Sequence, residues 1–300
     1  MISGENDLDQ AEKLRNIIKK NQISSSESKV QTARVITVSS GKGGVGKSNV
    51  AINLAVQFKK MGKKVLILDA DFGLANIEVM FGAIPKYSLA DVIYKGMGIR
   101  DVITNGPMDI GFISGGSGVV GMNNLGSDTL NFLVKNIAKL DEMADVVIID
   151  TGAGISEAVL EFLLASEEII LVTTPEPTSI TDSYSLLKAL KSNSRFRNET
   201  KLRVIANKVA STEDGQQLYH KLATVVEQYL GLETSLLGVI PQDVALKNAV
   251  MQQSPVTIAS PSAQSARAFQ DIADTLMNVP HTDKVYKKGM AAFFARFTGT

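Results

Sequence analysis

The sequence predicts an α/β fold, a mainly parallel twisted sheet of seven or eight strands with helices on both faces. Short runs rich in Val and Ile alternate with longer segments of helical periodicity. Continuous apolar strands separated by helices are typical of a parallel sheet that is covered on both sides. The expected strands are residues 34–40, 64–71, 109–114, 145–151, 168–174, 202–208 and 236–241.

The composition limits the class of protein. The 300 residues are 44% hydrophobic, enough to bury a substantial core. Lys plus Arg and Asp plus Glu number 31 each, so no net field draws the whole molecule to nucleic acid or an anionic membrane. Cysteine is absent, which excludes disulfides, thiolate catalysis and iron–sulfur ligation by this chain. With no signal-like or membrane-spanning apolar stretch, we expect a cytoplasmic protein.

We expect three parts along the chain. Residues 1–30 are predicted as an amphipathic helix followed by the polar linker "SSSES". Residues 31–280 should form one nucleotide-binding domain, and residues 281–300 a linker and a terminal amphipathic helix. In open parallel sheets the ligand lies beyond the carboxyl ends of the strands. Within residues 31–280, the candidate functional residues lie at or just beyond the carboxyl ends of expected strands, which favours one shared site.

A phosphate-binding loop follows the first expected strand. Residues 41–48, "GKGGVGKS", fit G-x-x-x-x-G-K-[ST] between a strand and a helix. Its glycines let backbone N–H groups face phosphate oxygens, while Lys47 supplies charge and Ser48 a ligand for Mg²⁺. Residues 43–49 are therefore expected around the phosphates: Gly43, Gly44, Val45, Gly46, Lys47, Ser48 and Asn49.

The loop carries a second lysine, Lys42, for which a solvated surface position is the simple explanation. However, "KGGVGKS" together with "DADFGLANIEVMFG" at 69–82 and "DVVIIDTGAGI" at 145–155 resembles the MinD/ParA family of ATPases with a deviant Walker A loop. The resemblance implies a homodimer closed over two ATP molecules, with Lys42 reaching the phosphates held by the other subunit. Hydrolysis would then depend on dimerisation.

The same resemblance assigns roles to three aspartates. Asp71 would orient the attacking water, although a helix cap or turn is the alternative for it. Asp150 would contact Mg²⁺ through water, and Asp69 would support the site and the metal.

The base contacts are less specific. Asn207 in "ANKV" stands where the family places an asparagine against adenine, and "VIPQD" places Pro241 and Asp243 near the same pocket. Turn chemistry explains any of these residues equally well. A guanine signature N-K-x-D is missing because Ala210 stands at its last position, which favours ATP.

The C-terminal segment has an aromatic stripe. If residues 285–297 are helical, apolar side chains share one face and basic ones lie off it, as in helices of the membrane interface. MinD-like proteins end in such a membrane-targeting helix, and a dimer would gain avidity from two copies. Packing of this helix on the protein's own core is the alternative. The expected membrane residues are Tyr286, Lys287, Lys288, Met290, Phe293, Phe294 and Phe297.

The N-terminal segment "DQAEKLR" at 9–15 resembles the start of the FlhG/FleN flagellar number regulators. In that family this segment engages FlhF, a signal-recognition-type GTPase. A disordered or self-docking end is the alternative. The residues expected to meet the partner are Asp9, Gln10, Ala11, Leu14 and Arg15.

Together these features predict a slow ATPase of the FlhG type that binds ATP and Mg²⁺ and cycles between the cytoplasm and the inner face of the cytoplasmic membrane. Expected partners are a second copy, an FlhF-type GTPase, and flagellar switch or transcriptional regulators. Specific binding of nucleic acid is not expected. Three alternatives stay open: a DNA-partitioning ParA, septum-site MinD itself, and a carboxylate-activating ligase on the same core.

Overall fold

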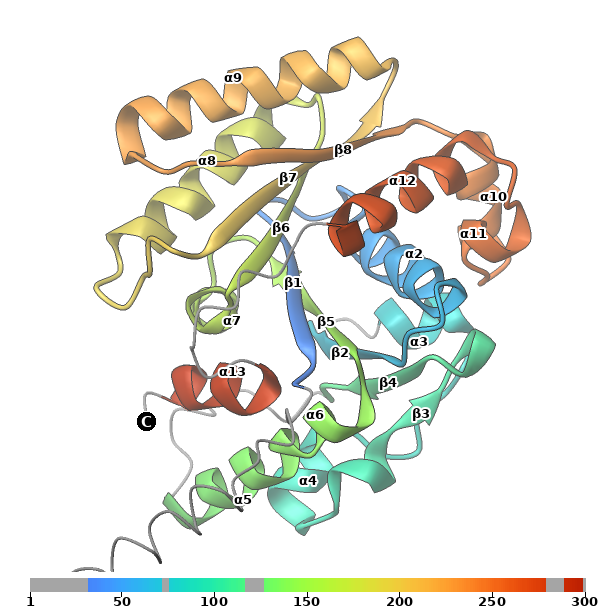
Figure 1. The fold of residues 1–300 in the computed structure, drawn as a ribbon, viewed down its shortest axis with the longest axis vertical. Helices are drawn as coiled ribbons and strands as arrows, with labels where there is room; N and C mark the ends of the chain where they lie inside the picture. The colour runs from blue at the N-terminus through green and yellow to red at the C-terminus, as the bar shows by residue number, and fades with distance from the viewer. Residues whose placement is uncertain (1–31, 72–75, 117–126, 279–288, 299–300) are drawn as a thin grey trace, which may run out of the picture. The chain divides into compact units, whose positions relative to one another are not determined.

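The computed structural model describes residues 32–71, 76–116, 127–278 and 289–298. Within them, eight strands form one sheet in the order β3-β4-β2-β5-β1-β6-β7-β8 (Figure 1). Neighbouring strands are parallel except at β3 and β4. The strands are β1 Arg34–Ser40, β2 Val65–Ala70, β3 Thr104–Asn105, β4 Gly111–Ser114, β5 Val146–Ala153, β6 Glu168–Thr173, β7 Lys201–Val209 and β8 Ser235–Pro241.

This sheet confirms the predicted fold class and each of the seven expected strands. The sequence did not predict β3, because two residues are too short to carry an apolar pattern. The helices are α2 Lys47–Lys60, α3 Asn76–Phe81, α4 Leu89–Lys95, α5 Ser127–Ala138, α6 Leu140–Met143, α7 Glu157–Ala165, α8 Pro177–Ser192, α9 Thr212–Leu230, α10 Val244–Met251, α11 Val256–Ala259, α12 Gln264–Asn278 and α13 Gly289–Thr298, with 3-10 turns η1 Ile99–Val102 and η2 Pro107–Asp109.

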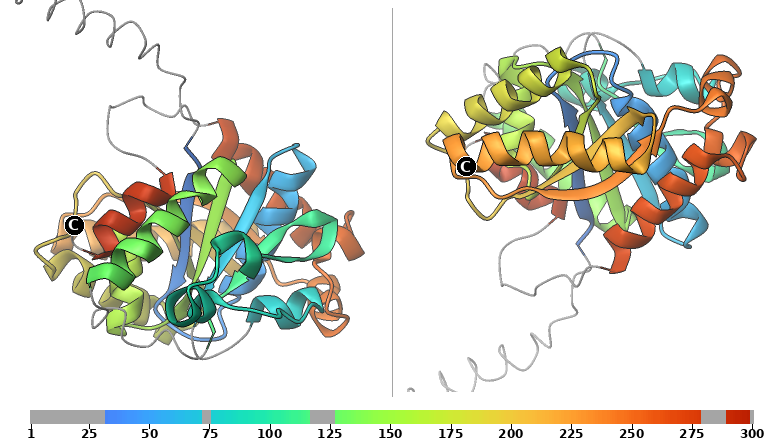
Figure 2. Two further views of the ribbon diagram at one scale, coloured as in Figure 1. Left: turned by 90° about the horizontal axis from the view of Figure 1, so that it is seen from below. Right: turned by 90° about the horizontal axis from the view of Figure 1, so that it is seen from above.

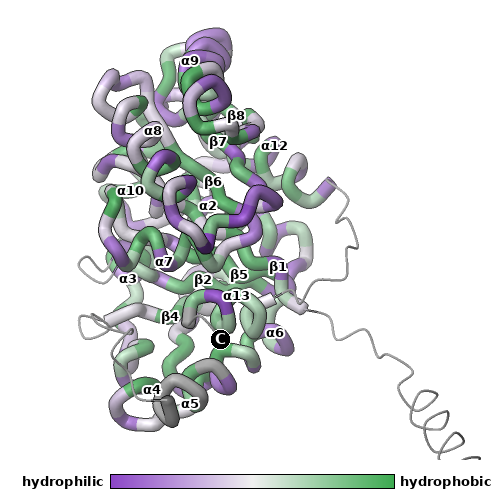
Figure 3. Tube along the Cα trace, turned by 90° about the vertical axis from the view of Figure 1, so that its left-hand side faces the viewer, coloured by the Kyte–Doolittle hydropathy of each residue, from purple (hydrophilic) through white to green (hydrophobic). Residues whose placement is uncertain are grey.

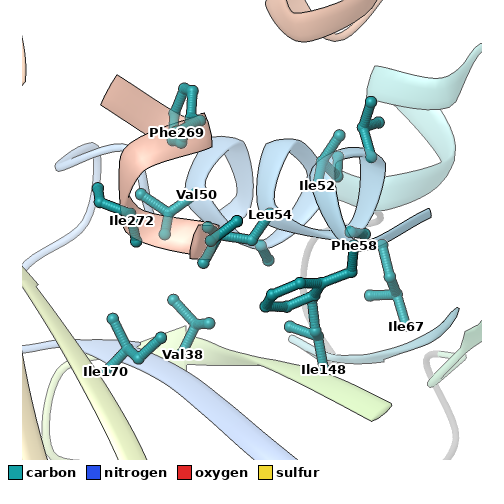
Figure 4. Packing of buried hydrophobic residues seen from close by; sticks show 14 of the residues in the cluster. Val38, Val50, Ile52, Leu54, Phe58, Ile67, Ile148, Ile170, Phe269 and Ile272 are labelled. Atoms are coloured by element: carbon teal, nitrogen blue, oxygen red, sulfur yellow. The ribbon is translucent and has the colours of Figure 1, made fainter. Parts of the chain in front are cut away.

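Helices cover both faces of the sheet. On one face, α2 and α12 pack over the strands; on the other lie α7, α8 and α9 (Figure 1). Successive strand residues alternate between the faces, so Ile148 joins the core under α2 while Val147 and Ile149 join the opposite core. Figure 4 shows Ile148 with the α2 side chains Leu54 and Phe58. Figure 3 shows that the apolar segments follow the strands, whereas polar residues gather on outer helices such as α9.

The C-terminal helix α13 packs on the protein's own core, on the side of the sheet where α5 and α7 lie (Figure 2). The stripe that we expected in a membrane interface is buried here: Met290, Phe293, Phe294 and Phe297 expose 0%, 2%, 0% and 6% of their surface. The ring of Phe297 lies 4.8 Å from that of Phe162 on α7. The alternative left open by the sequence, a helix docked on the core, thus describes the state seen in this structure.

The two ends of α13 are tied to the domain. Asp141 on α6 accepts hydrogen bonds from the backbone N–H groups of Met290 at 2.7 Å and Ala291 at 3.1 Å, and also from Ala33 before β1 at 3.2 Å. Near the other end, Arg296 forms an ion pair with Glu167. Residues 289–298 therefore belong to the same core as the nucleotide-binding domain, whereas Tyr286, Lys287, Lys288 and the N-terminal residues 9–15 lie outside the described residues.

In the part of the chain that the structure describes, no helix is both long and apolar enough to span a bilayer.

Candidate functional site

The phosphate loop joins β1 to α2 at the carboxyl edge of the sheet. Gly44 and Gly46 have positive φ angles of 77° and 96°, a conformation that glycine adopts without strain. Helix α2 begins at Lys47, and no side chain caps its amino end. The N–H groups at this helix start are thus available to an anion, as a phosphate site requires.

Asp182 of α8 and Asn207 of β7 pack closely against two glycines of the phosphate loop. A Cβ atom on Gly41 would lie 2.2 Å from the backbone carbon of Asp182 in α8, and one on Gly46 would lie 2.4 Å from Nδ2 of Asn207. Only glycine fits at either position without a shift of the neighbours. By contrast, no atom lies near the position of a Cβ on Gly43, so that side of the loop is open.

Lys47 and Asp150 form a buried ion pair at the base of the loop. The Nζ atom of Lys47 lies 3.2 Å from Oδ1 of Asp150, and their side chains expose 7% and 0% of their surface. Burial raises the pKa of Asp150, although Lys47 and Ser48 oppose this shift. Among the described residues, Oδ2 of Asp150 has no hydrogen-bond partner. A buried carboxylate oxygen without a partner fits a site that completes its contacts with Mg²⁺-bound water.

Asp69 and Asp71 lie beside this pair. Asp69 is opposite Asp150 in the register of β2 and β5, whereas Asp71 comes after the end of β2. Asp69 accepts hydrogen bonds from the N–H groups of Asp71 at 3.1 Å and Ile77 at 3.3 Å. Asp69 thus holds both the residue that follows β2 and the start of α3.

The Asp69 carboxyl is perturbed by this environment. Its burial, and next the nearby charge of Asp150, raise its pKa from 3.8 to about 7. Asp71 accepts a hydrogen bond from Nδ2 of Asn76 at 3.2 Å and lies near Gly152 of β5. The structure thus brings Asp69, Asp71 and Asp150 to one edge, as the sequence predicted.

In the described residues, no group of three acidic or histidine side chains is arranged to hold a metal by itself.

Lys42 points toward its own α8. Its Nζ atom lies 2.6 Å from Oε2 of Glu176 and 2.8 Å from Oγ1 of Thr178. The side chains of Lys42 and Glu176 are 35% and 59% exposed, so this ion pair lies at the surface. Sequence reasoning missed Glu176 and Thr178, although their place directly after β6, at the ligand edge, was a usable signal.

Asn207 supports the phosphate loop. Its Nδ2 donates to the carbonyl of Val45 at 2.7 Å, and its Oδ1 accepts from the N–H of Lys208 at 2.9 Å. Lys208, which sequence reasoning missed, has a positive φ of 56° and donates from Nζ to the carbonyl of Gly44 at 2.7 Å. Residues at the end of β7 therefore bind the backbone of the phosphate loop. A contact between Asn207 and adenine stays a prediction.

Asp243 caps α10 and joins it to α12. Its Oδ1 accepts from the N–H of Ala245 at 2.8 Å, and its Oδ2 accepts from the N–H and the hydroxyl of Ser265 at 3.0 and 2.7 Å. Turn chemistry, the alternative left open by the sequence, thus describes this carboxylate. Pro241 ends β8 nearby.

Asn49, on α2 next to the phosphate loop, has a buried side-chain oxygen, Oδ1, with no hydrogen-bond partner among the described residues. A buried polar atom of this kind is available to a ligand.

Comparison with known proteins identifies the family. The ParA family, described as NUBPL iron-transfer P-loop NTPase, matches residues 31–277. The chain belongs to the ParA/MinD family of P-loop ATPases.

Among relatives of this ATPase, the antiactivator FleN of Pseudomonas aeruginosa is 39% identical over 247 residues, which cover 82% of this chain and 87% of FleN. The flagellum site-determining protein YlxH of Helicobacter pylori is 33% identical over 292 residues, covering 96% of this chain and 97% of YlxH. The cell-division ATPase MinD of Pyrococcus furiosus superposes with a TM-score of 0.64 at 25% identity, covering 83% of this chain and all of MinD. MinD of Pyrococcus horikoshii, solved with Mg-ADP, gives the same TM-score and identity over 82% and 97% of the two chains.

The geometry indicates which residues of this ATPase would bind the nucleotide phosphates and the metal. The start of α2 and Lys47 would bind the phosphates, while Ser48 and, through water, Asp150 would hold Mg²⁺. The metal would neutralise charge on the phosphates during transfer to water. Asp71 lies at the edge of the same site, and its role in orienting that water stays a prediction. His220 lies on the exposed face of α9.

Proposed function

We propose that this ATPase is an ATP-dependent, dimerising switch that cycles on the membrane and regulates the number and placement of flagella. The observation that carries the proposal is the match to YlxH, named as a flagellum site-determining protein, over 96% of this chain and 97% of YlxH. Such coverage includes both flanks of the nucleotide-binding domain. The match to FleN over 82% of the chain supports the same assignment.

The position of Lys42 supports a role across a dimer. Its ammonium group is directed to Glu176 and Thr178 at the surface rather than into its own loop. Exposed ion pairs contribute little to stability, so phosphates of a second copy can replace these partners readily. A long flexible stem with a compact charge suits this change of position. Hydrolysis then requires the dimer, because only the partner copy completes the charge around the γ-phosphate.

The docked helix α13 supports membrane cycling. In the docked state, the aromatic stripe of Phe293, Phe294 and Phe297 is covered by the core. Release of the helix exposes this stripe together with its basic neighbours, and such a segment binds at a membrane interface. One copy binds weakly, whereas the ATP-bound dimer presents two and gains avidity. The docked state is then the cytoplasmic form.

The N-terminal residues 9–15 complete the proposal. They lie before the described domain and carry the "DQAEKLR" pattern. In the proposed function, Gln10 is offered to the active site of an FlhF-type GTPase, while Leu14 and Arg15 dock the helix. Flagellar switch and transcriptional regulators are further proposed partners.

Sedimentation with liposomes tests the membrane cycle. The intact chain and a chain ending at Asp283 are mixed with vesicles containing anionic lipid, in the presence of Mg-ATP or Mg-ADP. We expect the intact chain to pellet with ATP but not with ADP, and the shortened chain to stay in the supernatant under both conditions. Equal pelleting of the two chains would refute the role of the terminal helix.

Flagellar counts test the cellular role. The chain is expressed in Pseudomonas aeruginosa lacking FleN, and flagella per cell are counted by electron microscopy. We expect the intact chain to lower the count toward that of the parent strain, whereas Lys42→Ala, produced at an equal level, leaves it unchanged. A count that the intact chain does not alter would contradict the flagellar assignment while leaving the ATPase assignment intact.

A further inference from the structure

Exposed apolar side chains from three segments surround α3. Val79 lies on α3 and Ile84 just after it, Met108 lies in the β3–β4 connection, and Val250 and Met251 end α10. Ile84 exposes 93% of its surface, Met251 76% and Val79 56%. We call these five residues the α3 surface. Single exposed apolar residues are ordinary, but such residues gathered in one place mark an interaction site.

Contacts between backbone segments show that the three parts are neighbours. A Cβ atom on Gly106 would lie 2.6 Å from the ring of Phe81, so the β3–β4 connection packs against the end of α3. A Cβ on Gly82 would lie 3.6 Å from the side chain of Gln253, which places the residues just after α10 beside the end of α3. Both views in Figure 2 show α3 beside the α10–α11 region. The three segments that carry the α3 surface therefore meet at the end of α3.

Met108 combines an unusual backbone conformation with an exposed side chain. Met108 and Asp109 both have positive φ angles, 58° and 56°, which for residues other than glycine are costly and persist only where the surroundings enforce them. Met108 is nevertheless 41% exposed. Methionine side chains adapt to varied partner shapes and are frequent at binding surfaces.

Lysines border the α3 surface. At the end of α2, Nζ of Lys59 lies 3.4 Å from the carbonyl of Asp109, and Nζ of Lys60 lies 2.6 Å from the carbonyl of Thr257 in α11. Lys247 is exposed on α10. Glu78 is the acidic side chain of α3 itself. Asp109, next to Met108, is also exposed, so the border holds three lysines against two carboxylates. This excess of positive charge suits a partner with acidic residues beside its apolar anchors.

The α3 surface is connected to the nucleotide site through the start of α3. The N–H of Ile77 donates to Asp69, and Nδ2 of Asn76 donates to Asp71. Any change at these carboxylates on nucleotide binding or hydrolysis therefore acts on the position of α3. A partner bound to α3 would then make different contacts in the two nucleotide states, as coupling requires.

We propose that the α3 surface binds an amphipathic helix of a partner protein, with apolar anchors and acidic flanks, and that its affinity depends on the bound nucleotide. The same surface of a second copy is a poor occupant, because both borders are basic and repel each other. A membrane is also disfavoured, because among the described residues this surface presents no exposed aromatic ring of the kind that anchors interfacial helices. The proposal is independent of the flagellar role and of membrane cycling.

Two designed peptides of about 18 residues, long enough for a helix, serve as probes. Both carry one fluorescein and the same face of Leu and Met; the polar face is Glu in one and Lys in the other. Fluorescence anisotropy with the full chain is measured in Mg-ATP and in Mg-ADP. We expect the Glu peptide to bind saturably and about tenfold more tightly than the Lys peptide, with an affinity that differs about threefold between nucleotides.

The double variant Ile84→Ser with Met251→Ser is the matched test, and Tyr229→Ser, an exposed ring on α9, is its control. We expect the double variant to weaken binding of the Glu peptide about tenfold, with unfolding temperature and basal ATP turnover unchanged, and the control to bind normally. The proposal is overturned if the Glu peptide does not bind saturably, if the two peptides bind equally, or if the double variant binds like the parent. It is also overturned if the double substitution instead abolishes self-association, which would identify a second copy, or vesicle binding, which would identify a membrane.

Discussion

Phe294→Ala is expected to detach α13 from the domain without unfolding the rest of the protein. Docking buries four large side chains, Met290, Phe293, Phe294 and Phe297. Burial of each contributes about 1.5–3 kcal/mol, so together they contribute about 6–12 kcal/mol. The two backbone hydrogen bonds to the Asp141 carboxylate add about 1.5–3 kcal/mol each.

Ordering opposes this gain. Helix α13 has ten residues, and fixing the backbone of each costs about 1–2 kcal/mol. The favourable and unfavourable contributions cancel to within a few kcal/mol, so docking is marginal by itself. Removal of the fully buried ring of Phe294 costs about 3–5 kcal/mol. Because about 1.4 kcal/mol is a factor of ten, the undocked population should rise by a hundredfold or more, on the order of 10².

Hydrogen–deuterium exchange measured by mass spectrometry checks this expectation. The amides of residues 289–298 should lose their protection in Phe294→Ala, whereas those of β1, β5 and β6 keep theirs. Tyr229→Ala, which removes an exposed ring on α9, should change neither region. The opposite result is that α13 stays protected and the free energy of unfolding of the whole domain falls by the full amount of about 3–5 kcal/mol expected for the cavity. The helix would then be an integral part of the fold, and docking as a reversible state would be refuted.

Three further predictions concern the site and its control. Lys42→Ala should still bind ATP, but it should no longer dimerise with ATP, and its ATP turnover should fall by a factor on the order of 10³. Size-exclusion chromatography and phosphate release check this, with substitution of an exposed lysine, Lys221→Ala, as the control. Normal dimers and normal turnover would exclude a role of Lys42 across the interface. Asp141→Ala should raise liposome binding in Mg-ADP, because the amino end of α13 loses its acceptor while the aromatic stripe is intact; unchanged sedimentation would contradict this. Because the pKa of Asp69 is raised from 3.8 to about 7, the folded state holds the proton more tightly than the unfolded state, and this carboxyl lowers stability progressively as pH rises from about 4 to 7. Asp69→Asn should therefore raise the unfolding temperature of the nucleotide-free protein at pH 8, and this increase should become smaller toward pH 4. An increase in unfolding temperature that is the same at every pH would argue against the raised pKa of Asp69.

The sequence by itself determined the sheet and the chemistry of the phosphate site. Apolar runs that must be buried on both faces gave seven strands at their observed places, because only a parallel sheet covered by helices buries them. Lys47 and Asp150 were predictable for a related reason. A strand, a glycine-rich loop and a helix leave one position for the lysine, and the carboxyl ends of neighbouring strands meet at one edge.

Contacts between distant segments were decided only by the tertiary structure. Asn207 holds the phosphate loop because the end of β7 lies against Val45, which is 162 positions earlier in the chain. Likewise, Lys42 pairs with Glu176 because α8 begins beside the loop. Helix α13 shows the limit most clearly, since an aromatic stripe has the same periodicity whether it faces lipid or protein. The apolar side chains of α5 and α7 determine that, in this state, the stripe faces the core.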